Sequence, residues 1–458
     1  IHAKLNASGV GEKGTARVRI QADNFQAASD QWLLRFPRMG VDGRISPGPK
    51  LTYRGVIQLE KGEFAHNETG IRVSGISGSV PYTSEGQIAA LPLTIEQVDF
   101  SGIKLQKIQS DVFVSGRTAI AGGSADLSDG RLKMRFNAGA DSGATDNLFH
   151  IDFEIPATDL GAGSDLGNIL PAMTGFRGGG GIGLLGKINM LPDSGLSSMA
   201  EITLTDVNLT SKQARLNVSG LSGTIRFDRL HELRTLPSQV LRFQSLSLGP
   251  AKIMDGRVQV QLDGLTSGLM ERLDFAFSGG RVTTTAFRFP SQDTGMEIDF
   301  ICDRLQLADL LNMITGKSNA TGEGTISGVL PVRIGSDGIH FKEAHLATSP
   351  GDTGIIRVVD AADMTGGILL AEESIRDFSY EWAKVNIEDS RDHLNMVVQL
   401  SGKPRRKLPL KFDPARRDFV RDPSGERLVD LKGLLLELKF VDIDVNALLR
   451  ESGLQSKK

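Results

Sequence analysis

A glycine-rich segment near the middle of the chain has the spacing of a phosphate-binding loop. Gly181-Ile-Gly-Leu-Leu-Gly186 matches the dinucleotide fingerprint, and with Lys187 it approaches the loop that cradles nucleotide phosphates. Both kinds of site need a hydrophobic strand before the glycines and a helix after them, because the helix N-terminus holds the phosphates. Here Arg177 and a run of glycines come first, and Pro192 interrupts the residues that follow. The sequence therefore favours a flexible turn that leads into an alternating strand.

Residues that bind metals or act as nucleophiles are few and scattered. An odd separation of five places His340 and His345 on opposite faces of a strand, where they do not share a metal ion. Cys302 is the single cysteine, which excludes a disulfide framework and a thiolate zinc cluster. Ser77 and Ser222 lie in Gly-x-Ser-Gly segments, which we interpret as structural turns. No acid and base pair up, so we predict a protein that is not an enzyme and needs no cofactor or metal.

Charge and composition exclude further classes of function. The 52 Lys and Arg and the 55 Asp and Glu give a net charge of −3, without the basic surplus of a nucleic-acid-binding protein. Three Tyr and two Trp are too few for the aromatic girdles of an outer-membrane barrel. No segment reaches the ~18 apolar residues of a membrane-spanning helix. The chain starts at Ile1 inside a strand-like segment, and we expect it to be a fragment of a longer protein.

Most of the chain consists of segments that alternate apolar and polar residues. Leu132-Lys-Met-Arg-Phe136 and Val258-Gln-Val-Gln-Leu262 are examples, and this period of two is typical of β-strands. Asp129-Gly130, Asp255-Gly256 and Asp337-Gly338 separate such segments and predict hairpin turns. Because short turns join antiparallel strands, the sequence predicts a mainly β protein with an antiparallel, up-and-down sheet.

Few segments have a helical pattern. Gln306 to Ile314 is the clearest, and Ser164 to Leu170 and Ser29 to Leu34 occupy similar places between a strand and a glycine-rich stretch. Toward the C-terminus we predict a helix at Glu372 to Phe378, strands at Tyr380 to Ile387 and Leu394 to Leu400, and a last short helix at Val445 to Arg450.

Several short words recur in the same order along the chain. Val73-Ser-Gly-Ile-Ser-Gly78 returns as Val218-Ser-Gly-Leu-Ser-Gly223, and Ile57-Gln-Leu59 returns as Ile202-Thr-Leu204, both 145 residues later. A fixed period is typical of an array that grows by stacking. We therefore predict the end of an upstream repeat at 1–54, β repeats at 55–199 and 200–350, and an atypical C-terminal capping region at 351–458.

One face of the predicted sheet is apolar over many strands. We take the following residues as candidates for its lining: Ile202, Leu204, Val218, Phe227, Val258, Val260, Leu262, Phe275, Phe277, Phe287, Phe289, Ile298 and Phe300. Monomers rarely expose an apolar surface of this size, and the predicted helices are too few to cover it. The residues leave two arrangements open. The sheet packs on a second sheet to make a dry sandwich core, or it curls into a trough whose lining meets acyl chains.

Several segments in the second half of the chain, taken in their order along the sequence, resemble those of a known family. They are Gly324-Thr-Ile-Ser-Gly-Val-Leu-Pro-Val-Arg-Ile334, Gly338-Ile-His-Phe-Lys-Glu-Ala344, Pro350-Gly-Asp-Thr-Gly-Ile-Ile-Arg357, Ile375-Arg-Asp-Phe-Ser-Tyr380 and Asp444-Val-Asn-Ala-Leu-Leu449. On these residues the chain resembles the YdbH family of AsmA-like intermembrane phospholipid transport proteins, chiefly over residues 200 to 450. Lys403 before Pro404 departs from the family's usual Asn.

The resemblance implies an elongated, curled antiparallel sheet with an open apolar groove that holds phospholipid acyl chains. It implies a periplasmic bridge that carries phospholipids between the inner and outer membranes of a Gram-negative envelope. It further implies an inner-membrane anchor through an N-terminal helix that is missing here, and a small outer-membrane lipoprotein as the partner at the C-terminal end. The alternative function is a non-catalytic β scaffold or outer-membrane assembly factor with a dry sandwich core.

Overall fold

The computed structural model divides the chain into two compact units. Unit 1 comprises Ile1–Lys212 and Leu221–Leu236, and unit 2 comprises Gln213–Gly220 and Pro237–Lys458. The structure describes residues 2–443 except for gaps at 13–14, 68–69, 101–102, 128–129, 145–147, 170–172, 192–194, 213–215, 249–250, 265–266, 290–294, 316–318, 336–337, 391–392 and 423–427.

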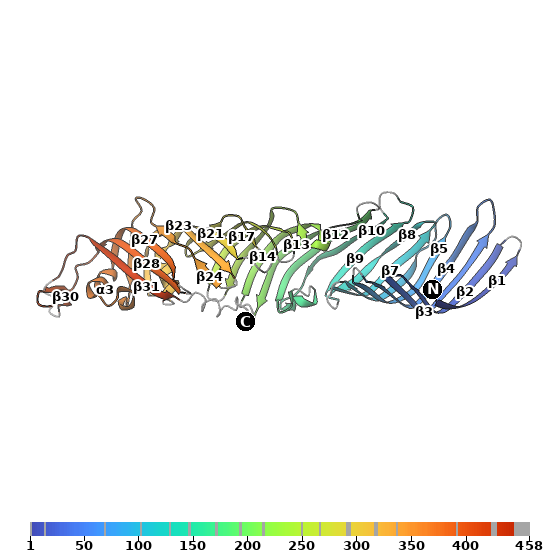
Figure 1. Cartoon of the computed structure of the whole chain (residues 1–458), viewed down its shortest axis with the longest axis horizontal. Helices are drawn as coiled ribbons and strands as arrows, with labels where there is room; N and C mark the ends of the chain where they lie inside the picture. Colours follow the sequence, from blue (N-terminus) through green and yellow to red (C-terminus); the bar gives the residue numbers. More distant parts are fainter. Residues whose placement is uncertain are drawn as a thin grey trace. The chain divides into compact units, whose positions relative to one another are not determined.

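Unit 1 is built almost entirely of strands, drawn in blue to green in Figure 1. Its elements are β1 (His2–Glu12), β2 (Thr15–Ala28), β3 (Trp32–Ser46), β4 (Thr52–His66), β5 (Ile71–Thr83), β6 (Leu91–Phe100), β7 (Ile103–Ser115), β8 (Thr118–Leu127), β9 (Leu132–Asp141), β10 (Phe149–Asp159), β11 (Ser164–Asp165), the 3-10 turn η1 (Leu166–Asn168), β12 (Arg177–Leu191), β13 (Gly195–Ser211), the 3-10 turn η3 (Leu230–Glu232) and β15 (Arg234–Thr235). Neighbouring strands pair in chain order, as where Val41 of β3 faces Ile20 of β2 and Ile57 of β4.

The described residues of unit 2 combine strands with three short helices, and β14 (Leu216–Arg229) is shared between the two ranges. Its other elements are β16 (Gln239–Leu248), β17 (Ala251–Leu262), β18 (Gly268–Phe277), β19 (Gly280–Thr284), β20 (Phe287–Phe289), β21 (Met296–Gln306), α1 (Leu307–Thr315), β22 (Ala320–Glu323), β23 (Thr325–Gly335), β24 (Gly338–Phe341), β25 (Ala344–Ala347), β26 (Gly354–Val358), α2 (Ala362–Thr365), α3 (Leu369–Ile375), β27 (Phe378–Ser390), β28 (His393–Pro404), β29 (Leu410–Asp413), β30 (Asp418–Arg421) and β31 (Leu434–Ile443).

The predicted mainly β, antiparallel fold is confirmed. Strand pairing is antiparallel throughout the described pairs except for a two-residue parallel contact of β5 with β7, at Tyr82 and Thr83. Two predicted hairpins are also confirmed, since Leu127 of β8 pairs with Leu132 of β9, and Gly335 of β23 pairs with Gly338 of β24. The hairpin predicted at Asp255-Gly256 is wrong, because these residues lie inside β17, where Asp255 adopts a left-handed φ of 48°.

The helix predictions have mixed outcomes. The segment from Gln306 forms α1, and the helix predicted from Glu372 is α3, which begins and ends three residues earlier than expected. The segment from Ser164 makes only the two-residue strand β11 and the single turn η1. The helix predicted from Ser29 is wrong, because Trp32 opens β3, and pairing of β3 along both edges outweighs the weak helical tendency of six residues. The helix predicted from Val445 lies outside the described residues.

Each unit has its own packed cluster of apolar side chains. In unit 1, Leu132 of β9 is fully buried and packs with Leu127, Ile155 and Leu166 of η1. The cluster in unit 2 is much larger. Its fully buried members come from strands and helices alike, and they include Leu311 of α1, Ile326, Ile356, Ile375 of α3, Phe378, Val398, Leu400 and Leu438. The helices therefore cover apolar strand residues at the C-terminal part of unit 2.

Candidate functional site

The unit 1 candidates lie on long strands with clean alternation. Ile202 and Leu204 of β13 pair with Leu184 and Ile182 of β12, so the four side chains form an apolar patch. All four are half-buried, whereas Thr203 between the two candidates is exposed. Phe227 of β14, the third candidate in this unit, is buried. These side chains are the part of unit 1 that we carry forward as candidate lining.

The unit 2 candidates continue the same type of surface. Val258, Val260 and Leu262 of β17 alternate with polar residues, and Val258 pairs across the sheet with Leu273 of β18. The rings of Phe275 and Phe277 meet edge to face, with their centroids 6.4 Å apart. In β20 one polar residue separates Phe287 from Phe289. In β21 one polar residue likewise separates Ile298 from Phe300.

Burial divides the candidates into two groups. The buried ones are Val218, Phe227, Val260, Phe275 and Ile298, with 5–9% of each residue exposed. The half-buried ones are Ile202, Leu204, Val258, Leu262, Phe277, Phe287, Phe289 and Phe300. Phe275 belongs to the large unit 2 cluster, and Phe277 and Phe300 pack against it. The half-buried residues that contact neither cluster are the part of this surface that keeps apolar area accessible, and they include Ile202, Val258 and Phe287.

A recurring β-bulge keeps the apolar residues on one face. In β13, Asp206 has a left-handed φ of 49° and its N–H donates to the Ser222 hydroxyl oxygen at 2.9 Å. The bulge inserts an extra residue, so Leu204 and Val207 both turn toward the covered side although they are three residues apart. Without it, the alternation would place Asp206 there and turn Val207 to solvent.

The same arrangement occurs in two other strands. The N–H of Lys61 donates to Ser77 at 3.0 Å, and the N–H of Arg304 donates to Ser327 at 2.9 Å. Lys61 and Arg304 also have left-handed φ values, of 49° and 53°. The interpretation of Ser77 and Ser222 as turn residues is therefore wrong, since both lie within strands and their hydroxyls hold bulges in the neighbouring strand. The Gly-x-Ser-Gly words supply the serine at two of these contacts, and Gly324-Thr-Ile-Ser-Gly328 supplies it at the third.

Phenylalanine rings cover glycines on adjacent strands at several places. The ring of Phe243 lies over Gly256, its partner across the β16–β17 pair, and Phe153 lies over Gly186 in the same manner. A Cβ atom at either glycine would overlap the ring. An aromatic side chain over a strand glycine restores the packing that the glycine lacks. Gly186 closes the supposed phosphate-binding motif, so this residue has a packing role.

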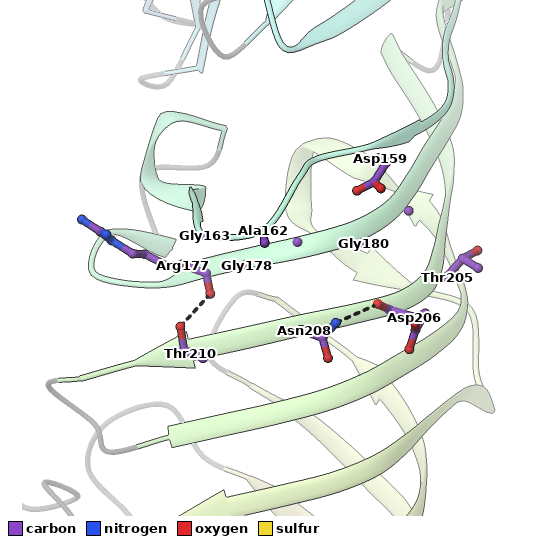
Figure 2. A pocket seen from close by; sticks show the side chains of 12 residues that line it. Asp159, Ala162, Gly163, Arg177, Gly178, Gly180, Thr205, Asp206, Asn208 and Thr210 are labelled. Atoms are coloured by element: carbon purple, nitrogen blue, oxygen red, sulfur yellow. Dashed lines mark hydrogen bonds between the residues drawn. The ribbon is translucent and has the colours of Figure 1, made fainter.

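The glycine run of β12 borders a pocket of about 540 Å³ in unit 1 (Figure 2). Asp159 and Asp206 line it together with the glycines, and Asn208 donates its side-chain N–H to the Asp206 carbonyl at 3.3 Å. Thr210 donates to the Arg177 carbonyl at 3.3 Å. β12 runs on as a 15-residue strand through the motif, so no helix N-terminus faces the pocket. The nucleotide interpretation therefore lacks its structural requirement.

The groups with potential for catalysis or metal binding do not converge. His340 and His345 lie on separate strands, β24 and β25, so the prediction that they occupy one strand is wrong. Within the described ranges, no group of three or more His, Cys, Asp or Glu is placed to hold a metal ion. Burial raises the pKa of the Cys302 thiol to about 11, which keeps this side chain protonated and unreactive at neutral pH.

Two features of the apolar surface are not predicted by the sequence analysis. The flexible turn predicted at residues 181–186 is wrong, because Ile182 and Leu184 lie inside β12 and each pairs with a candidate residue of β13. Their spacing of two inside Gly181-Ile-Gly-Leu-Leu-Gly186 is the signal that could have revealed a strand. The three-residue spacing at each bulge, as between Cys302 and Leu305, also breaks a strict period of two.

Comparison with known proteins gives one match. No curated protein and no solved structure matches the chain. Among the helices of the described residues, none has the length and apolar content that crossing a membrane requires. The family model described as YdbH-like, intermembrane phospholipid transport protein YdbH, matches residues 157–369, a range that includes every candidate lining residue. The resemblance predicted from the sequence is thereby confirmed over this segment, which is similar to the YdbH-like intermembrane phospholipid transport family, and that family is not a catalytic one.

Proposed function

We propose that the apolar face of each unit lines a groove that holds phospholipid acyl chains, in a periplasmic protein that bridges the inner and outer membranes. The observation that carries this proposal is the set of half-buried apolar residues that pack on neither cluster, of which Ile202, Val258 and Phe287 are examples. Each methylene that leaves water for such a surface contributes about 0.8 kcal/mol. An acyl chain is therefore held firmly in total, while successive positions along a uniform lining differ little in free energy.

The finer parts of the proposal follow from the family. We propose repeats at 55–199 and 200–350 that supply the groove and an atypical end at 351–458. Anchoring to the inner membrane through an N-terminal helix and pairing of the C-terminal end with a small outer-membrane lipoprotein complete the bridge. Within the described residues β31 pairs with β28 alone, and an added strand at its other edge would satisfy the backbone groups there. In this role the protein is a conduit and not an enzyme.

A second candidate is a non-catalytic scaffold with a dry interior. The observation that favours it is the large unit 2 cluster, in which Ile326, Phe378 and Val398 are fully buried. A packed core leaves no space for a lipid tail. The scaffold interpretation applies best to the part of unit 2 that α1, α2 and α3 cover, and the conduit interpretation to the half-buried residues outside it.

Photo-crosslinking separates the two functions. Phe287 is the informative position, because it is half-buried and outside the unit 2 cluster, whereas Phe275 belongs to that cluster and would crosslink to protein in either case. A photoreactive residue at Phe287 should capture phospholipid, and the same residue at the neighbouring exposed Arg288 should not. Protein-only crosslinks at Phe287, Ile202 and Val258 would contradict the conduit.

A further inference from the structure

A basic hairpin near the C-terminal end of unit 2 differs in charge from the rest of the chain. Residues 403–421, here called the basic hairpin, contain eight Lys or Arg and two Asp, whereas the whole chain has a net charge of −3. The strands β29 and β30 at its centre form a separate two-stranded sheet. In Figure 1 the label β30 lies beyond α3, at the end of unit 2. The positive charge is therefore concentrated on one projecting element.

The base of this hairpin is held firmly. Leu408 and Leu410 are fully buried, and Leu408 forms a β-bridge with Val429. Arg406 and Arg421 each contact the Glu373 carboxylate, at 3.1 and 3.4 Å, and only 6% of the Glu373 side chain is exposed. These two ion pairs fix the direction of the basic hairpin relative to α3. Movement of the hairpin would break them and leave the buried Glu373 charge without these two partners, which is costly.

The tip of the hairpin has the opposite character, since it presents aromatic and basic side chains to solvent. Phe412 is 53% exposed, and its ring meets Phe419 edge to face with centroids 5.5 Å apart. Lys411, Arg416 and Arg417 are exposed around this pair. Phe419 is half-buried, so Phe412 is the exposed ring of the pair. An exposed ring surrounded by cations suits a surface that accepts apolar rings and positive charge together.

The basic side chains of the tip differ in whether they form an ion pair with an acidic residue. Arg416 contacts Asp413 at 3.8 Å, and Asp413 also accepts the backbone N–H of Ala415 at 2.9 Å, so this acid stabilises the turn. Within the part of the chain that the structure describes, no acid lies within ion-pair distance of Lys411 or Arg417. These two side chains are therefore available to an external anion.

We propose that the basic hairpin docks unit 2 on the surface of a bilayer that contains anionic phospholipid. Lys411 and Arg417 bind lipid phosphates, while Phe412 enters the interface between head groups and acyl chains. The charge and the aromatic pair carry the argument, and the choice of a bilayer over an acidic protein rests on the proposed lipid-transport function. A conduit that delivers lipid needs a fixed contact with the membrane that receives or donates it.

Vesicle flotation of the full chain tests this docking. Vesicles of phosphatidylcholine alone are compared with vesicles that also contain about 30% phosphatidylglycerol, at low and high salt. The unmodified chain should float with the anionic vesicles and lose most of this binding at high salt, because the Debye length shortens from about 10 Å at 0.1 M to about 3 Å at 1 M. Absence of binding, or equal binding to both compositions, would overturn the proposal and point to an acidic protein partner.

Matched variants identify the surface. The double variant Lys411→Gln with Arg417→Gln should weaken anionic-vesicle binding about 30-fold, since each cation near such a surface contributes about a fivefold effect. Phe412→Ser should also weaken binding but leave its salt dependence in place. The control is Lys104→Gln with Lys133→Gln, which removes the same charge from two exposed lysines of unit 1. An equal loss in the control would show that only net charge matters.

The outcome is separable from the groove proposal. Hairpin variants should still crosslink phospholipid at Phe287 when lipid is supplied in detergent, because the lining is unchanged. Conversely, a groove variant such as Phe277→Asp should float with anionic vesicles as the unmodified chain does. If the unmodified chain crosslinks phospholipid at Phe287 but does not float with anionic vesicles, the hairpin inference alone is overturned. If it floats with these vesicles but gives only protein crosslinks at Phe287, the conduit alone is overturned.

Discussion

A single carboxylate on the apolar face should separate a lipid path from a structural face. Ile202 of β13 is half-buried, and its strand neighbour Thr203 is exposed on the other side. Aspartate at each position makes a matched pair, because the strand, the pairing with β12 and the substituted side chain are shared. Ile298 would be a poorer choice, since only 5% of it is exposed and a charge there would threaten folding itself.

The structure sets the size of both effects. A fully buried Ile contributes about 1.5–3 kcal/mol, so loss of a half-buried one, together with the weaker strand preference of Asp, should lower the free energy of unfolding by about 2 kcal/mol. Thr203→Asp should lower it by less than about 1 kcal/mol. On the lipid side, about four methylenes that meet a hydrated carboxylate would lose about 3 kcal/mol, a factor of roughly 100 in local occupancy.

Two measurements test this reasoning. Thermal unfolding followed by circular dichroism should show that both variants fold, with the lower midpoint in Ile202→Asp. Titration with a fluorescent phospholipid should show strongly reduced binding for Ile202→Asp and normal binding for Thr203→Asp. Normal lipid binding by a folded Ile202→Asp variant would refute the claim that this face contacts acyl chains, and equal loss in both variants would show that the charge acts at a distance.

Four further predictions concern the framework of the sheet. Gly256→Ala should lower the free energy of unfolding by about 1–3 kcal/mol because its methyl group overlaps a ring, whereas Gly433→Ala, where nothing lies within 4 Å, should change it by less than about 0.5 kcal/mol in denaturant titrations. Ser222→Ala removes the acceptor that holds a bulge and should cost about 1 kcal/mol in the same assay. Cys302, whose thiol pKa is about 11, should react with iodoacetamide at pH 8 only after unfolding, as mass spectrometry would show. Burial raises the pKa of Tyr380 to about 12, so the unfolded chain loses this proton first and stability should fall as pH rises from about 10 to 12, a slope that Tyr380→Phe should reduce.

The alternation of apolar and polar residues predicts the strands because it reflects directly which side chains are buried. Val258, Val260 and Leu262 occupy one side of β17 as the pattern of residues predicts. The hairpins at Asp129-Gly130 and Asp337-Gly338 were predictable too, since local turn chemistry specifies them. Asp255-Gly256 has the same letters but lies inside a strand, because Phe243 covers Gly256 from the neighbouring strand. The difference is a contact between strands, which a local signal does not contain.

The extent of cover over the apolar face was not predictable from alternation. Phe275 and Phe287 both sit in alternating segments, yet the first belongs to the large unit 2 cluster and the second does not. The separation depends on where α1 and α3 pack. α1 contacts the strands on either side of it in the chain, β21 and β22, whereas α3 contacts β26, β28 and β30. The net charge of −3 averages out the local excess of cations in the basic hairpin, although the run Lys403-Pro-Arg-Arg-Lys-Leu-Pro409 shows it in the sequence.

The bulges explain why the recurring words contain two glycines and a serine. A strict period of two over a strand as long as β13 would keep each residue's face fixed, but the left-handed residue shifts the remainder of the strand by one position. The Ser222 hydroxyl satisfies the backbone N–H of Asp206 at that point, and Gly220, with a φ of 66°, bends β14 to bring the hydroxyl there. A bulge also increases local twist, so the same words that keep apolar residues together also bend the sheet that carries them. Replacement of Ser222 alone should therefore disturb both the curvature of the sheet and the position of the apolar residues after the bulge. The stability of the β13–β14 strand pair and the accessibility of the apolar face are coupled in this way.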